Sequence, residues 1–270
     1  MRTRGWRALL LAGAWLAAAW PVAAHDSWLS PSPAGAPGGP VQLELTTGNR
    51  FPVQEFSQSA ASVEQSQCSH GAGRMPLRAV REQPLWLELV AGSGAGGPRP
   101  LACWVALGAV ETEIEPRLVD VYLNEIRAPL AVRQGWQAQR AQGLPWRESY
   151  RKFARIELSE AAARTGERAA ARRPVGLGLE IVVLGDQAIG VGRPLTFQVL
   201  RDGAPLPGLA IELVSERSPI GIWRVTDDGG QLTHSLPFGG RWLLRGTELI
   251  ASAPAGTWQS RFVTLAIEAP

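Results

Sequence analysis

Short runs in which apolar and polar residues alternate dominate the chain, and this pattern predicts strands. In 110–115 the alternation is strict, with Val110, Thr112 and Ile114 on one face and three glutamates on the other. Further strand-like runs lie at 41–46, 85–90, 101–107 and 154–158. The Gly-, Ser- and Pro-rich stretches 57–74 and 91–100 are typical of loops. The first half of the chain therefore predicts a β-sandwich.

A helical period interrupts the strands at Pro116, a residue that suits the first turn of a helix. Apolar residues recur after it at spacings of three and four. A second helical stretch is expected over 129–141, with Val132 and Trp136 on one face. Residues 159–174 are small and charged, which indicates an exposed linker between domains or an irregular helix.

The strand pattern returns at Val175 and continues to the end of the chain. Turn signals such as Asp202-Gly203 and Asp227-Asp228-Gly229-Gly230 separate the runs. The seven runs are 179–184, 195–201, 210–215, 222–226, 231–236, 241–247 and 261–268. They predict an immunoglobulin-like or prealbumin-like sandwich. The expected fold is mainly β, with two β-sandwich domains, 25–158 (helical excursion 116–153) and 175–270, joined by the linker 159–174.

The first 24 residues have the pattern of a secretory signal peptide. Three arginines precede the apolar stretch 8–20, and small residues at Val22-Ala23-Ala24 suit a signal peptidase. Cleavage after Ala24 would make His25 the first residue of an exported, periplasmic protein. No later apolar run approaches 20 residues, so no membrane span is expected after cleavage.

Charge and cysteine content narrow the class of protein. Three of the 27 Lys+Arg lie in the signal, which leaves 24 bases against 24 acids. A formally neutral chain gives no reason to expect nucleic-acid binding. Cys68 and Cys103 are the two cysteines, and in an oxidising compartment such a pair is most simply one disulfide. The alternative is that both are thiolate metal ligands.

The new N-terminus is the main candidate for chemistry. His25 would carry a free α-amine and an imidazole, which together can chelate one transition metal, and Asp26 can add an oxygen. The alternative is that His25 is a dangling end with no role. His70 and His234 are the other histidines, and Glu248 is a further candidate ligand. Each also has an ordinary interpretation: a loop residue for His70, a core or edge residue for His234, a turn carboxylate for Glu248.

Several segments in order along the chain resemble a family of uncharacterised periplasmic proteins labelled as the periplasmic component of cobalt or nickel uptake systems. The segments are His25-Asp26-Ser27-Trp28, Thr47-Gly48-Asn49-Arg50-Phe51-Pro52, Ser149-Tyr150-Arg151-Lys152, 174–182, 226–230 with 240–245, and 260–265. The resemblance implies a β-rich two-part fold, export, and a role in handling nickel or cobalt. Family members often have a histidine where this chain has Glu248, which would make a site there richer in oxygen.

These observations lead to a hypothesis and two rivals. The hypothesis is an exported, non-enzymatic protein that binds nickel or cobalt, with copper as a further alternative, and serves a membrane transporter as carrier or accessory component. The first rival is an envelope interaction or adhesion module without a metal. The second is a copper oxidase with an N-terminal histidine brace, which needs a second imidazole from His70 or His234. No motif for hydrolytic catalysis or phosphate binding occurs in the sequence.

Overall fold

A computed structural model describes residues 25–270 except 36–38, 72, 93–98 and 159–162. The expected signal peptide, 1–24, and most of the expected loop 91–100 lie outside the described residues. Within the described chain, no helix has the length and apolar character needed to cross a membrane.

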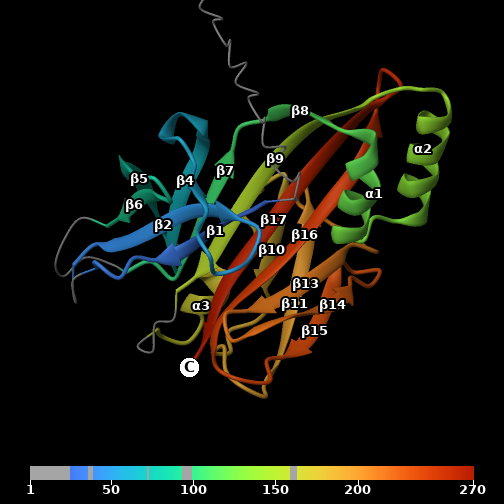
Figure 1. The fold of residues 1–270 in the computed structure, drawn as a ribbon. Helices are drawn as coiled ribbons and strands as arrows, with labels where there is room; N and C mark the ends of the chain where they lie inside the picture. Colours follow the sequence, from blue (N-terminus) through green and yellow to red (C-terminus); the bar gives the residue numbers. More distant parts are fainter. Residues whose placement is uncertain (1–24, 36–38, 72, 93–98, 159–162) are drawn as a thin grey trace, which may run out of the picture.

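Strands make up most of the described chain, and the helices lie between them (Figure 1). The first group of elements is β1 (Asp26–Pro31), β2 (Val41–Gly48), β3 (Phe56–Ser57), the 3-10 helix η1 (Ala60–Ser62), β4 (Val63–His70), β5 (Gly73–Glu82), β6 (Leu87–Ala91), β7 (Ala102–Leu107) and β8 (Val110–Ile114). Helices α1 (Pro116–Glu125) and α2 (Leu130–Ala141), strand β9 (Trp146–Glu157) and helix α3 (Glu167–Ala171) follow. The remaining strands are β10 (Leu179–Val183), β11 (Pro194–Arg201), β12 (Ala204–Pro205), β13 (Ala210–Ser215), β14 (Ser218–Val225), β15 (Gln231–Ser235), β16 (Gly240–Ser252) and β17 (Thr257–Ala269).

The strands form one large mixed sheet and one small antiparallel sheet. The large sheet has 13 strands, in the order β1-β2-β6-β5-β4-β7-β9-β17-β16-β13-β14, with β3 beside β2 and β8 beside β9. The small sheet has the order β10-β11-β12, with β15 also paired to β11. The β9–β17 pair is parallel, and it joins strands from the first and second halves of the chain.

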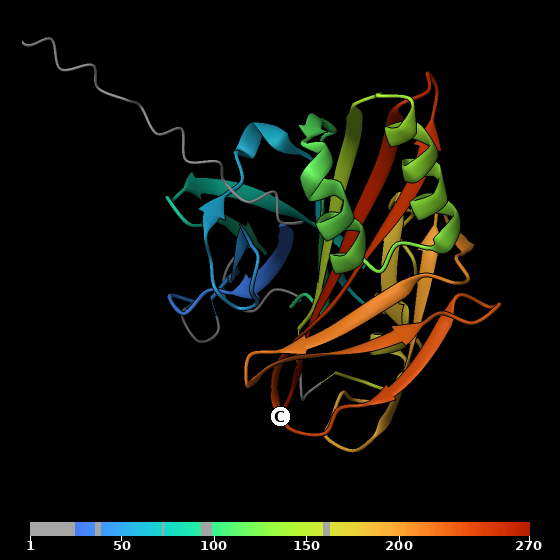
Figure 2. The ribbon, with the colours of Figure 1, turned by 45° about the vertical axis from the view of Figure 1, so that its right-hand side comes forward.

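Strands β9, β16 and β17 are covered on both faces. Because side chains alternate along a strand, successive residues of these strands pack into different cores. Trp242 and Leu244 of β16 pack against the small sheet, whereas Leu243 faces the N-terminal strands. Farther along that second face, Leu249 packs under α1 and α2. Figure 2 shows the two helices standing over one end of the long strands, with the small sheet toward the other end. One face of these strands therefore serves two separate cores.

The N-terminal strands curl back so that β1 lies against β9 and β17. Two hydrogen bonds of 2.7 Å fix β1: Thr264 Oγ1 donates to the Ser27 carbonyl, and the hydroxyls of Ser27 and Thr47 bond to each other. Trp28 is 1% exposed and makes an edge contact with Phe51. This burial anchors the chain three residues after His25.

A disulfide joins Cys68 and Cys103, which are directly opposite each other on β4 and β7. The bond confirms the pairing expected from the sequence and is consistent with an extracytoplasmic location.

The layer of α1 and α2 is held by aromatic packing and one buried acid. Trp146 stacks on Trp258 with ring centroids 4.4 Å apart. Glu148 of β9 accepts hydrogen bonds from Tyr122 and Trp146, at 2.9 and 2.8 Å, and from Ser260. Burial raises the pKa of Glu148, against the lowering effect of these three donors.

The mainly β fold, both expected helices and the seven C-terminal strands are confirmed, and α2 begins one residue later than expected. The expectation of a loop over 57–74 was wrong, since β4 and the start of β5 lie there. Of the two alternatives for 159–174, the described part contains a short helix, α3, and its end is not exposed, because Ala171 and Arg172 are buried. Arg172 donates to Glu157 and to the Gly185 and Gln187 carbonyls. The division into two sandwich domains stays a prediction, while strands of both halves share the large sheet.

Replacing Trp258 with alanine should lower the free energy of unfolding by about 3–5 kcal/mol. The indole is 4% exposed, stacks on Trp146 and donates to Gln139 Oε1 at 2.9 Å. Urea unfolding would measure the loss. Leu130→Ala, at a site 69% exposed on α2, is the control and should change stability by less than about 0.5 kcal/mol. Equal losses of stability in the two variants would contradict the packing of Trp258 in the core under α1 and α2.

Candidate functional site

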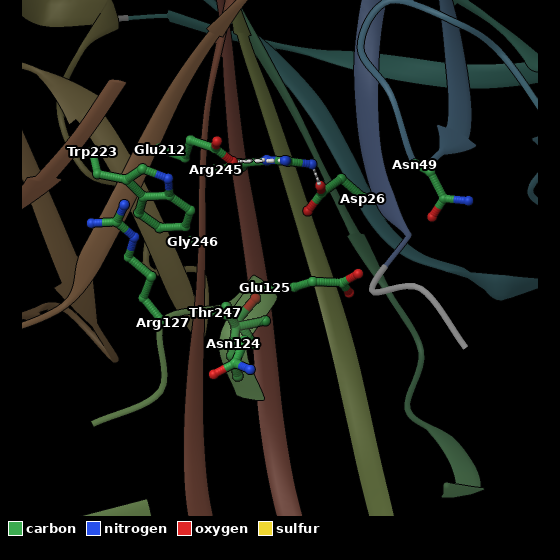
Figure 3. Close-up of a pocket in the computed structure, with 11 residues that line it drawn as sticks. Asp26, Asn49, Asn124, Glu125, Arg127, Glu212, Trp223, Arg245, Gly246 and Thr247 are labelled. Atoms are coloured by element: carbon green, nitrogen blue, oxygen red, sulfur yellow. Dashed lines mark hydrogen bonds and ion pairs between the residues drawn. The ribbon is translucent and has the colours of Figure 1, made fainter. Parts of the chain in front are cut away.

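A cavity of about 430 Å³ opens where β1, the end of α1 and the middle of β16 meet. It lies on the face of β16 that also carries Leu243 and Leu249. On this face it separates the core under the N-terminal strands from the core under α1 and α2. The lining residues are Asp26, Asn49, Asn124, Glu125, Ile126, Arg127, Glu212, Trp223, Arg245, Gly246 and Thr247. Figure 3 shows Asp26 and Glu125 on one side of this space and Trp223 with Arg127 on the other.

A partly buried ion-pair network forms one wall of the cavity. The Arg245 guanidinium donates to Asp26 Oδ2 at 2.6 Å and to Glu212 Oε2 at 2.7–2.8 Å. Burial raises the pKa of Asp26, and Arg245 opposes this shift. Burial alone would lower the pKa of Arg245, but the two carboxylates raise it above its usual value. The network ties the start of β1 to β13 and β16.

Lys152, the one lysine of the chain, lies close to this network on β9. Its side chain is 9% exposed, and its ammonium sits 5.4 Å from the Tyr150 ring and 5.9 Å from the Phe262 ring. Burial lowers the pKa of Lys152 to about 8, against the opposing charge of Asp26. Lys152 therefore loses its proton more easily than an exposed lysine does.

His25 lies immediately before β1, next to a carboxylate that the sequence interpretation did not single out. Its Nε2 atom is 3.5 Å from Glu55 Oε2, and its ring makes an edge contact with Phe56 at 5.2 Å. Glu55 is itself held by the backbone N–H and the side-chain amide of Asn49, at 3.1 and 3.3 Å. Asn49 therefore belongs both to the cavity wall and to the surroundings of His25.

The other candidate ligands lie elsewhere. His70 ends β4, against Gly73 across the β4–β5 turn. His234 is on β15 in the small sheet, where Nδ1 accepts from Arg224 at 3.3 Å; burial and then Arg224 lower its pKa. Glu248 is on the opposite face of β16 from Arg245 and accepts from Arg201 at 2.8 Å.

The structure brings His25 and Asp26 together but does not gather all five candidates. Among the side chains that the structure describes, no group of three or more His, Cys, Asp or Glu could hold a metal ion. An N-terminal site would differ, because one of its donors would be the α-amine that cleavage after Ala24 would create on His25. The imidazole lies beside one of the carboxylates, that of Glu55.

Sequence reasoning missed Glu55, Arg245, Glu212, Arg127 and Lys152. Glu55 lies in a turn-rich segment without a distinctive pattern. Arg245 and Lys152 did carry a signal, because each is a charged residue on a strand face that also carries apolar residues. Arg245 shares its face with Leu243 and Leu249, and Lys152 shares its face with Ile156. A charge in such a position predicts a buried partner.

The fold and the site define a mainly β protein with a polar cavity set between two hydrophobic cores. The chain matches the family model described as a domain of unknown function (DUF4198) over residues 22–247 and belongs to this family. No curated protein and no solved structure matches the chain.

Lys152 should make stability rise with pH between about 8 and 10.5. In this range the unfolded chain, with a lysine pKa near 10.5, binds a proton that the folded protein has released. Unfolding free energies measured from pH 7 to 10.5 should therefore climb for the wild type relative to Lys152→Met. The variant should also be the more stable of the two at pH 7. If the unfolding free energies of the two proteins changed with pH in parallel, the lowered pKa of Lys152 would be contradicted.

Proposed function

We propose that the processed protein is an exported, periplasmic metal-binding protein that serves nickel or cobalt uptake as a carrier or accessory component rather than as an enzyme. The observation that carries this proposal is the position of His25 against Glu55. The family resemblance seen in the sequence supports the choice of metals, and the disulfide supports export.

The donor set fits a borderline first-row ion. The α-amine and Nδ1 of an N-terminal histidine can close a chelate ring on one metal, since both are neutral nitrogen donors once deprotonated. A proton on Nε2, 3.5 Å from the Glu55 carboxylate, places the ring lone pair on Nδ1. Glu55 then acts as the partner that orients the imidazole, and Asn49 holds Glu55 in place.

The surroundings also position the backbone of the proposed ligand. Asp26 is tied to Arg245, Ser27 to Thr47 and Thr264, and Trp28 is buried, so the three residues after His25 are all held. A preformed site loses less conformational entropy on binding. Asp26 contributes here mainly by fixing β1, since its Oδ2 atom already accepts from Arg245.

Protein confirmed by mass to begin at His25 should bind Ni²⁺ or Co²⁺ tightly, and the same protein with one alanine added before His25 should lose that binding. The extension removes the α-amine from His25 while leaving every side chain in place. Glu55→Gln should weaken binding about 10–100-fold, as expected for loss of a partner that orients a ligand. Isothermal titration with Ni²⁺, Co²⁺ and Cu²⁺ would measure all three proteins.

Two further controls sharpen this titration. His234→Gln removes a histidine that lies in the small sheet, and it should leave the affinity unchanged. Affinity should fall as the pH drops below the pKa of the α-amine, about 7.7–8.0, because the proton competes with the metal. Equal binding with and without the added alanine would reject the N-terminal site, and absence of binding in both would favour the interaction-module alternative.

A further inference from the structure

We propose that the 430 Å³ cavity is a second binding site and that its ligand is a small zwitterion of dipeptide size. The carboxylate of the ligand would bind Arg127, and its ammonium would bind Glu125 and Asp26. This site goes beyond the proposed metal function, since it needs neither the α-amine nor the imidazole of His25.

Arg127 is placed at a cost in backbone energy. Helix α1 ends in a Schellman motif: the Ala128 N–H donates to the Leu123 carbonyl at 2.9 Å, and the Arg127 N–H donates to the Asn124 carbonyl at 3.2 Å. The residue at the position of Arg127 in this motif is usually glycine, and Arg127 has φ of 49°. A non-glycine residue held in the left-handed region points to a use for its side chain.

The Arg127 side chain is ordered in a way that leaves its donors available. Its guanidinium lies over the Trp223 ring, 4.3 Å from the centroid, and no described carboxylate forms an ion pair with it. A cation–π contact uses no N–H···O hydrogen bond, so the N–H groups of Arg127 stay available to an acceptor in the cavity. A planar carboxylate is the group that these N–H groups bind best, through two parallel hydrogen bonds.

The opposite side of the cavity offers acceptors. Glu125 lines it and forms no ion pair with a described residue, and Asp26 binds Arg245 through Oδ2 only. Figure 3 shows the second oxygen of Asp26 turned toward the space beside Glu125. Asn124 and Glu125 at the carboxyl end of α1 both line the cavity, and this end of a helix has a negative partial charge. An ammonium group matches this side.

The part of the wall that carries Glu125 and Arg127 is held in place, and the volume of the cavity limits the size of the ligand. Arg133 of α2 donates to the carbonyls of Leu123 and Ala128, at 2.7 and 2.9 Å, and to the Asn124 side chain at 2.6 Å. It thereby holds the turn that carries Glu125 and Arg127. A cavity of 430 Å³ is at the small end of ligand pockets, which suits a dipeptide rather than a larger molecule.

Calorimetric titration of the chelator-treated protein with dialanine, alanylleucine and lysylalanine tests this proposal. At least one should bind, and Arg127→Gly and Glu125→Gln should each weaken that binding about tenfold or more, as loss of one charge-assisted contact implies. Glycine is favoured at the φ of Arg127, so Arg127→Gly should keep the melting temperature of the wild type or raise it. Asp120→Asn, on the same helix and paired with Arg140, is the control that should bind normally.

Dipeptides with one charged end blocked test which residue binds each end of the ligand. The carboxamide of the bound dipeptide should bind wild type and Arg127→Gly equally, and its N-acetyl form should bind wild type and Glu125→Gln equally. Absence of binding by all three dipeptides up to about 10 mM, where a millimolar site would be mostly filled, would overturn the proposal. Binding that survives Arg127→Gly would overturn it too. Since no metal is present, failure here leaves the metal titration unaffected, and the reverse also holds.

Discussion

Burial of both faces of β9, β16 and β17 is the constraint on which the rest of the structure depends. These strands cannot present a polar face to water along most of their length, because the small sheet covers one side and the N-terminal strands and helices cover the other. Each covering layer has its own core. Strands β9, β16 and β17 are therefore a partition that these layers share.

The boundary between two layers on the same face explains where the cavity lies. Apolar residues fill the face under each layer, but the stretch between them carries Arg245 and Thr247. Arg245 is kept stable there by two carboxylates, since a single buried guanidinium would be strongly unfavourable. The same network anchors β1 beside His25. The start of β1 and the cavity thus depend on one set of ionic contacts.

Alternation and turn signals were enough to predict the C-terminal strands and both helices of the middle segment. They failed for β4 and β5, where Gln65, Ser66 and Gln67 give no apolar face because these strands are only half buried. The long β16–β17 hairpin was also predicted too short, since its outer ends face helices rather than strands. Such errors arise where tertiary packing, not local sequence, decides the structure.

The candidate site was predictable only where it is local. His25 and Asp26 could be named because the cleavage signal lies next to them. Arg245 and Lys152 come from strands about 90 residues apart in sequence that meet only through the parallel pairing of β9 with β17 and the hairpin beside it. No periodicity encodes that meeting. The sequence can show a charged residue among apolar residues of a strand. It cannot show which residue of a distant strand is the partner of that charge.

Helices α1 and α2 connect β8 to β9, two strands that pair with each other as the arms of a hairpin. The helix pair is thus a single insertion, and four of the residues that line the cavity, Asn124 to Arg127, lie in it. The lining of the cavity can therefore change within one contiguous segment without disturbing the strands that define the fold. The insertion separates an adaptable part of the molecule from the strands that carry it.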